Sequence, residues 1–194
     1  IEAFTDNYKD IINDHEIDAV LICSPTDTHA DISIEAAKAG KHIFCEKPVD
    51  LDVGKIKDTI AEVKKAKVKM QVGFNRRFDH NFSRLNELVE TGRLGEIHTI
   101  RITSRDPKPP HAGYISKSGG IFMDMTIHDF DMALFLSKSK VTEVYAHADV
   151  LIDPQIGKEG DFDTAIVMLK FENKCTAIIE NSRQAVYGYD QRIE

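Results

Sequence analysis

Unbroken apolar runs of strand length alternate with amphipathic segments over the first part of the chain. Such runs are typical of strands covered on both faces in a parallel sheet, and apolar residues three or four positions apart predict helices between them. This alternation with short links predicts an α/β fold, the second half of a doubly wound parallel sheet. We expect this first domain over residues 1–74, with strands at residues 18–23, 41–45 and 69–74 and helices at residues 28–39 and 52–66.

The pattern then changes to that of a second, α+β domain over residues 75–194. Helical spacing predicts a helix at residues 78–91, and a strongly apolar stretch predicts another at residues 121–136, after a Pro- and Gly-rich loop at residues 106–120. The turn Glu172-Asn173-Lys174 predicts a hairpin between two of the strands. We expect a mainly antiparallel open sheet with strands at residues 96–105, 141–152, 164–172, 175–184 and from residue 187 onward.

Composition excludes several classes of protein. The 194 residues are 42% hydrophobic and 29% charged, which is typical of globular proteins rather than of disordered or fibrous chains. The 32 acidic residues outnumber the 25 basic ones and no basic stripe is present, so we expect no nucleic-acid partner. No apolar run approaches the roughly 18 residues of a membrane span. Three cysteines without CxxC spacing favour reduced thiols in a cytoplasmic protein.

One signature of nucleotide-binding α/β domains is missing. The 11 glycines contain no GxGxxG, the fingerprint that seats a dinucleotide pyrophosphate on a helix N-terminus. The chain also lacks an initiator Met and ends in a strand-like pattern. We therefore expect part of a longer protein, without the first half of its doubly wound domain and without the end of its second domain.

Polar clusters follow each of the three predicted parallel strands: Ser24-Pro25-Thr26, then Glu46-Lys47-Pro48, then Asn75-Arg76-Arg77. In an open parallel sheet, the ligand crevice lies outside the carboxyl ends of the strands. Any one cluster is typical of an ordinary polar loop, whereas three together favour a binding site. Pro48 restricts the backbone at Lys47, which suits an ammonium group that must be aimed.

The apolar helix predicted at residues 121–136 carries Asp124, His128 and Asp131 at positions i, i+4 and i+7, on one helical face. Buried Asp or His is unfavourable unless it is paired or used. One interpretation is structural, with His128 bonded to a backbone carbonyl and the acids forming a solvated stripe. A second is a metal site, for which no third or fourth ligand occurs at a recognisable spacing. The third is a general base, His128, oriented by Asp124.

Five stretches of the sequence resemble the glucose-fructose oxidoreductase / inositol dehydrogenase / rhizopine catabolism (Gfo/Idh/MocA) family, and the last two are similar to its inositol-oxidising members. They are Cys45-Glu-Lys-Pro48, Gln71-Val-Gly-Phe-Asn-Arg-Arg-Phe-Asp79, Gly119-Gly-Ile-Phe-Met-Asp-Met-Thr-Ile-His-Asp-Phe-Asp131, Thr103-Ser-Arg-Asp-Pro107 and Asn181-Ser-Arg-Gln-Ala-Val-Tyr-Gly-Tyr-Asp-Gln-Arg192. The resemblance implies an N-terminal Rossmann domain that binds NAD and a second domain that forms a homotetramer through its open sheet.

The resemblance also implies roles for individual residues. The catalytic set of the family matches Lys47, Asp124 and His128. The positions that line the cofactor match Ser24, Pro25, Thr26, His29, Glu46, Lys47 and Asn75. The positions near the polyol substrate match Lys47, Arg76, Asp106, Asp124, His128 and Tyr189.

The function implied is the NAD-dependent oxidation of a ring hydroxyl of myo-inositol to a ketone, with His128 as general base and no metal ion. Three alternatives stay open. The first is another sugar or polyol dehydrogenase of the family, the second is a non-catalytic NAD-binding sensor or transcriptional regulator, and the third is a metal-dependent hydrolase or isomerase. The presence of Lys47, Asp124 and His128 argues against the sensor, because relatives that lost this set serve as regulators.

Overall fold

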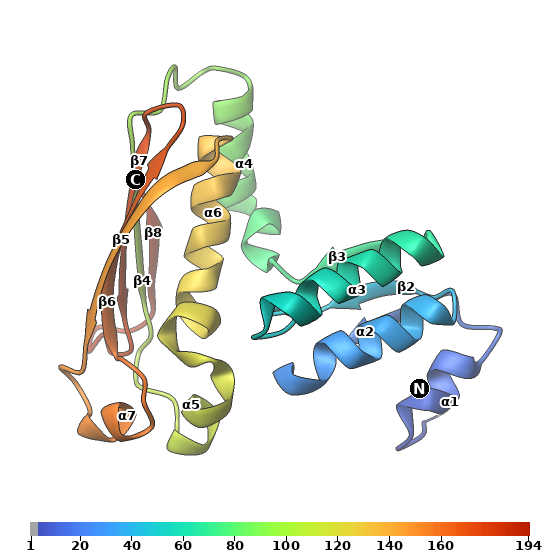
Figure 1. Cartoon of the computed structure of the whole chain (residues 1–194). Coiled ribbons are helices and arrows are strands. Elements are labelled where there is room, and N and C mark those ends of the chain that lie inside the picture. Colours follow the sequence, from blue (N-terminus) through green and yellow to red (C-terminus); the bar gives the residue numbers. More distant parts are fainter. Residues whose placement is uncertain (1–3) are drawn as a thin grey trace. The chain divides into compact units, whose positions relative to one another are not determined.

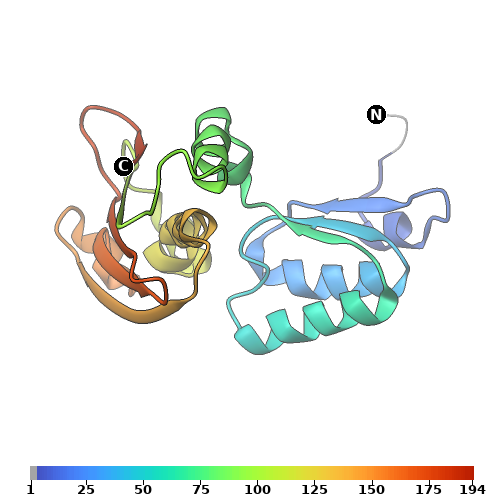
Figure 2. The same ribbon diagram turned by 90° about the horizontal axis from the view of Figure 1, so that it is seen from above.

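The computed structural model describes residues 4–194, and the chain divides into two compact units, Ile1–Phe74 and Asn75–Glu194 (Figure 1). The first unit is a three-stranded, fully parallel sheet in the order β1-β2-β3. Figure 2 shows α2 and α3 side by side against one face of this sheet. Its elements are α1 (Tyr8–Asn13), β1 (Ala19–Ile22), the 3₁₀ turn η1 (Thr26–Thr28), α2 (His29–Lys38), β2 (His42–Cys45), α3 (Val53–Ala66) and β3 (Met70–Val72).

The core of the first unit lies between the sheet and α2, where Val20, Ile22 and Ile43 pack with the small side chains of Ala36 and Ala37. The expectation that these strands are covered on both faces is wrong for β1 within residues 4–194. Leu21 is 74% exposed, because its side chain points to the face opposite Val20 and Ile22.

The second unit is a five-stranded sheet in the order β5-β6-β7-β4-β8, with α4 and α6 on one face (Figure 1). β4 and β7 are parallel, and the other neighbours are antiparallel, including the predicted hairpin of β6 and β7. The structure thus confirms the predicted fold class. The elements are the 3₁₀ turn η2 (Asn75–Phe78), α4 (His80–Glu90), β4 (Thr99–Arg105), α5 (Ala112–Ser118), the π-helical turn η3 (Phe122–Thr126), α6 (Ile127–Ser137), β5 (Val141–Asp149), α7 (Pro154–Lys158), β6 (Thr164–Phe171), β7 (Thr176–Ser182) and β8 (Asp190–Ile193).

The alternation of buried and exposed residues along β6 shows that one face of this sheet is covered. Val167 and Leu169 are buried under α6, whereas Ile166 and Met168 are 47% and 46% exposed on the opposite face. This period of two is typical of a sheet with one covered face.

Two sequence predictions of secondary structure are wrong in the second unit. The loop predicted at residues 106–120 contains α5, which Gly119 and Gly120 end with φ angles of 82° and 79°. The helix predicted at residues 121–136 is confirmed, and its first turn is the π-helical turn η3. The strand predicted at residues 141–152 ends at Asp149, and α7 follows because Asp153 caps its first turn. Within residues 4–194, no helix has the length and apolar character to span a bilayer.

Candidate active site

In the first unit, the loops that follow β1 and β2 are tied together by His29, which is 2% exposed. Its Nδ1 lies 2.8 Å from the carbonyl oxygen of Pro48, and its Nε2 lies 2.8 Å from that of Ser24. The Ser24 hydroxyl lies 2.6 Å from that of Thr28. His29 therefore holds two of the predicted polar clusters side by side at the carboxyl edge of the sheet, which is where open α/β sheets bind ligands.

The loop after β2 is fixed by its backbone and by the Glu46 carboxylate. The Glu46 N–H donates to the carbonyl oxygen of Ile22 at 2.9 Å, and its Oε2 accepts from the Lys47 N–H at 3.3 Å. A side chain at Gly73 would place its Cβ 2.9 Å from Glu46 Oε2, so the glycine leaves room for the carboxylate. Lys47 is half-buried, and its peptide bond to Pro48 is cis.

In the second unit, a hollow of about 840 Å³ brings together four of the predicted site residues: Asn75, Arg76, His128 and Tyr189. Gln191 and the C-terminal strand residues also line it. Its lining includes an imidazole, a phenol, two guanidinium groups and three amides, which is a set of donors and acceptors suited to a polyhydroxylated ligand.

Arg76 reaches this hollow from a buried ion pair with Asp129, whose side chain is fully buried. The same carboxylate accepts from Ser104 Oγ at 2.7 Å and from Asn181 Nδ2 at 2.7 Å. Ser104 Oγ also lies 2.8 Å from Gln191 Oε1. The guanidinium of Arg76 is therefore held in one orientation, and a buried network links it to Gln191.

Asp131, which the sequence placed on one face with Asp124 and His128, has a structural role. Its two carboxylate oxygens accept from Nε and Nη2 of Arg77 at 2.8 and 2.5 Å. The Arg77 guanidinium also stacks 4.8 Å from the ring centre of Phe135. This fork-shaped ion pair fastens the first residues of the second unit to α6.

Asp124 lies in the π-helical turn η3 and is held through both of its carboxylate oxygens. The Tyr114 hydroxyl donates to Oδ1 at 2.6 Å, and Arg183 Nη1 donates to Oδ2 at 2.9 Å. Burial, together with the hydrogen bond to Asp124, raises the pKa of Tyr114 to about 12. Tyr114 consequently keeps its proton near neutral pH and stays a donor to the carboxylate.

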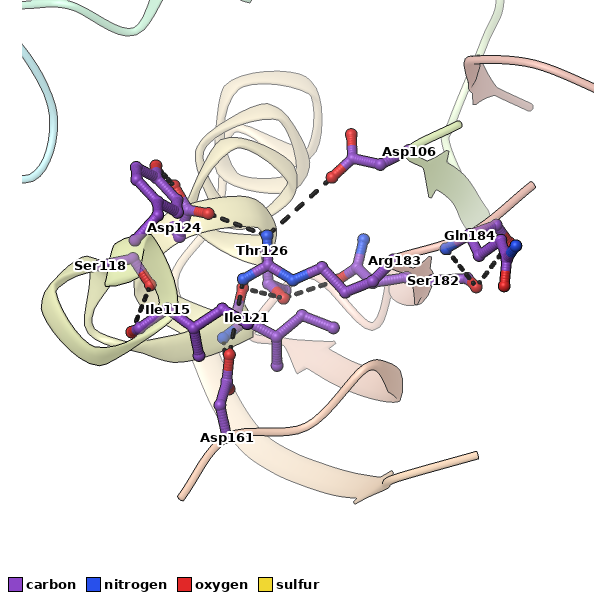
Figure 3. Close-up of polar contacts among 12 residues, drawn as sticks. Asp106, Ile115, Ser118, Ile121, Asp124, Thr126, Asp161, Ser182, Arg183 and Gln184 are labelled. Atoms are coloured by element: carbon purple, nitrogen blue, oxygen red, sulfur yellow. Dashed lines mark hydrogen bonds and ion pairs between the residues drawn. The ribbon is translucent and has the colours of Figure 1, made fainter. Parts of the chain in front are cut away.

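Asp106 lies near the same cluster, with Oδ2 3.9 Å from Arg183 Nη1 (Figure 3). The predicted site residues of the second unit therefore fall into two groups. Asn75, Arg76, His128 and Tyr189 line the hollow, whereas Asp106 and Asp124 surround Arg183.

Two family models match the chain. One, the GFO/IDH/MocA C-terminal domain, matches residues 82–194, and the other, the oxidoreductase family with an NAD-binding Rossmann fold, matches residues 1–74. The chain belongs to the GFO/IDH/MocA oxidoreductase family. This confirms the resemblance found in the sequence, and the family's NAD-binding Rossmann fold confirms the expected cofactor.

Curated and solved relatives within the GFO/IDH/MocA family agree with this assignment. A protein of Thermotoga maritima named myo-inositol 2-dehydrogenase is 56% identical over 190 residues, which are 96% of this chain and 57% of the relative. The crystal structure of a probable dehydrogenase from Thermotoga maritima superposes with a TM-score of 0.95 at 54% identity, covering 97% of this chain and 57% of that one.

A third relative carries ligands. The structure of scyllo-inositol dehydrogenase from Lactobacillus casei with bound NAD(H) and scyllo-inositol superposes with a TM-score of 0.86 at 33% identity, over 97% of this chain and 57% of that one. The chain thus spans a little over half the length of the GFO/IDH/MocA relatives that it matches.

The sequence interpretation missed five residues that shape the two groups: Ser104, Tyr114, Asp129, Arg183 and Gln191. Ser104, Asp129, Arg183 and Gln191 lie within the stretches that carry the family resemblance, but nothing in their spacing indicated a role. Tyr114 lay in the segment predicted as a loop. A search for every charged residue inside otherwise apolar segments would have included Asp129 together with Asp124 and Asp131.

Proposed function

We propose that the protein to which this chain belongs is an NAD-dependent dehydrogenase that oxidises a ring hydroxyl of myo-inositol to the ketone 2-keto-myo-inositol. The observation that carries the proposal is the hollow in which His128 lies with Asn75, Arg76 and Tyr189. This hollow places a base, His128, beside several hydrogen-bonding groups. The names of the relatives from Thermotoga maritima and Lactobacillus casei support a cyclic polyol as the ligand.

In the proposed reaction, neutral His128 accepts the proton of the substrate hydroxyl as its carbon is oxidised. Asp124 stabilises the imidazolium that forms, since a nearby carboxylate favours the charged form of histidine. The ammonium group of Lys47 donates to the reacting oxygen and stabilises developing alkoxide charge. NAD⁺, when bound, supplies the acceptor for the hydride.

The remaining residues of the hollow bind the other hydroxyls. Arg76, Tyr189 and Gln191 supply fixed donors and acceptors in the hollow. Asp106, which lies beside Arg183 and outside the lining of the hollow, supplies a carboxylate. A polyol needs many such partners, because every buried hydroxyl without one lowers affinity.

The cofactor fits the carboxyl edge of the first sheet, where His29 joins the two loops that follow β1 and β2. We assign Ser24, Pro25, Thr26 and Glu46 to the NAD contacts, with His29 holding these loops in place. Asn75 completes the set on the nicotinamide side.

We further propose that the open face of the five-stranded sheet joins subunits of a homotetramer. Tyr145 of β5 and Ile166 and Met168 of β6 are between 46% and 61% exposed on this face. Exposed apolar surface of this kind is typical of an interface between subunits.

Replacement of the base tests the reaction. His128→Ala in the full-length protein should lower kcat/KM for myo-inositol by at least about a hundredfold, the lower end for general-base catalysis. The exposed His15 provides the control, since His15→Ala should keep the wild-type rate. In the wild type, kcat/KM should rise with pH across the range in which histidine side chains lose their proton. Wild-type activity in His128→Ala contradicts the assigned base.

A different polyol or sugar of the same size is the second candidate, because the Lactobacillus casei relative binds scyllo-inositol. A panel of inositol isomers and glucose distinguishes it from myo-inositol. A regulator with a silent site would bind NAD⁺ without turnover of any of them.

A further inference from the structure

Arg183 is a buried cation at the end of β7, with a side chain that is 2% exposed. Three carboxylates face it (Figure 3). Asp124 Oδ2 lies 2.9 Å from Nη1, Asp161 Oδ2 lies 3.6 Å from Nη2, and Asp106 Oδ2 lies 3.9 Å from Nη1. Charges of this kind are unfavourable away from water unless they compensate one another. Arg183 contributes a positive charge that compensates these three acids.

The turn that carries Asp124 is held at its start by Asp161, in the loop before β6, and at its end by Asn181 of β7. At its start, the Ile121 N–H donates to Asp161 Oδ1 at 2.8 Å, and Asp161 faces Arg183. At its end, the Thr126 hydroxyl donates to Asn181 Oδ1 at 2.6 Å. Such π-helical turns occur frequently at functional sites. Arg183 therefore acts on Asp124 directly and, through Asp161, on the turn beneath it.

The geometry of Arg183 differs from that of an arginine that only fastens two elements. Arg77 grips Asp131 through two nitrogens and both carboxylate oxygens. Arg183 gives Asp124 a single N–H, and within residues 4–194 its Nε and Nη2 have no hydrogen-bond partner. The guanidinium lies between Asp124 and Asp106 instead of forking onto one acid.

We infer that Arg183 is a positioning residue for the oxidation, which fixes the Asp124 carboxylate in the orientation that His128 requires. This inference rests on the proposed function, because it assigns Arg183 a role through Asp124. Arg183 also balances the charge that Asp106 brings toward the substrate.

The test is a double-mutant cycle in the full-length protein with Arg183→Met and Asp124→Asn, alone and together. Arg183→Met should lower kcat by about a hundredfold, which is the effect of a misplacement of about 1 Å in a catalytic constellation. KM for NAD⁺ should stay within about twofold, because Arg183 acts on the second unit only. In the Asp124→Asn background, Arg183→Met should lower kcat by less than about threefold further, because the two residues act as one unit.

Equal losses in both backgrounds would mean that Arg183 stabilises the fold without acting through Asp124, and would overturn the inference. Arg183→Lys keeps the charge, and its kcat should be at least about tenfold higher than that of Arg183→Met. Arg183→Met leaves three carboxylates facing one another, so Arg183→Met/Asp161→Asn relieves their repulsion if the single variant does not fold. If neither folds, Arg183→Lys replaces Arg183→Met in the cycle, with the same criterion of non-additivity.

Crystal structures of the wild type and Arg183→Met give a readout that does not depend on turnover. We expect the Asp124 carboxylate to lose its 2.6 Å contact with the Tyr114 hydroxyl in the variant. An unmoved carboxylate contradicts the inference. A wild-type protein that oxidises no polyol refutes the proposed function instead, and the two structures still decide whether Arg183 positions Asp124.

Discussion

The Asp163 carboxylate stabilises the second unit through hydrogen bonds whose contribution can be measured. Its side chain is fully buried, yet it accepts four hydrogen bonds. Oδ1 accepts from the Leu151 N–H and the Thr164 hydroxyl, each at 2.9 Å, and Oδ2 accepts from the Ile152 and Asp153 N–H groups at 2.8 and 3.0 Å. This cage orders the segment between β5 and α7.

Asp163→Asn keeps the shape but replaces one acceptor oxygen by an NH₂ group, so two donors lose their partner. Hydrogen bonds to a charged group contribute about 1.5 to 3 kcal/mol each, which predicts a loss of about 3 to 6 kcal/mol in the free energy of unfolding. Asp149→Asn is the control, because that side chain is exposed and accepts from the Val150 N–H. We expect the control to stay within about 1 kcal/mol of the wild type.

The difference between wild type and Asp163→Asn should also depend on pH. Burial alone would raise the pKa of Asp163, but the three N–H groups and the Thr164 hydroxyl outweigh it and lower the pKa. The unfolded chain therefore binds the proton at higher pH than the folded one, and the stabilisation is complete above the unfolded pKa, near 4. It is lost as the pH falls from there through the folded pKa.

Urea unfolding followed by circular dichroism measures both effects at pH 7 and at a series of lower pH values. A loss under about 1 kcal/mol at pH 7 would refute the reasoning, and so would a difference that grows as the pH falls below 4.

Two further predictions concern a glycine and the thiols. Gly120→Ala would place its Cβ 2.7 Å from Asp161 Oδ1, whereas Gly92→Ala meets no atom within 4 Å, and both have positive φ angles. Gly120→Ala should therefore lower the melting temperature clearly more than Gly92→Ala, and equal shifts would contradict the clash. Cys23 is exposed, whereas burial raises the pKa of Cys45 to about 11. A thiol reagent at pH 8 should modify Cys23 at least about a hundredfold faster than Cys45, since the thiolate is the reactive form. Peptide mapping by mass spectrometry measures both rates, and a similar rate at Cys45 would contradict the prediction.

Patterns of local periodicity predicted most of the elements, because these elements bury regular apolar stripes. The parallel strands β1, β2 and β3 and the hairpin of β6 and β7 follow from such stripes. The short helix α5 escaped because its seven residues lie among prolines and glycines and its N-cap is His111. For α7 a signal existed, since Asp153-Pro154 combines a capping residue with proline in the first turn.

Long-range pairing explains what the sequence did not reveal about the site. The partners of Asp124 are ten and fifty-nine positions away, at Tyr114 and Arg183, and no spacing rule connects them. The parallel contact of β4 with β7, which brings Ser104 beside Asn181, is likewise a property of the assembled sheet. The i, i+4, i+7 spacing found His128 and Asp124, but it could not reveal the π-helical turn that carries Asp124 or the Arg77 partner of Asp131.

The central claim is that the parent protein oxidises an inositol with NAD⁺, and its most direct test is NAD⁺ reduction by the full-length wild type. The rate with myo-inositol would be compared with the rates for scyllo-inositol, chiro-inositol and glucose, in the same buffer and at matched concentrations. We predict turnover of myo-inositol clearly above the other three. Measurable NAD⁺ binding without turnover of any of these polyols would contradict the claim and indicate a sensor.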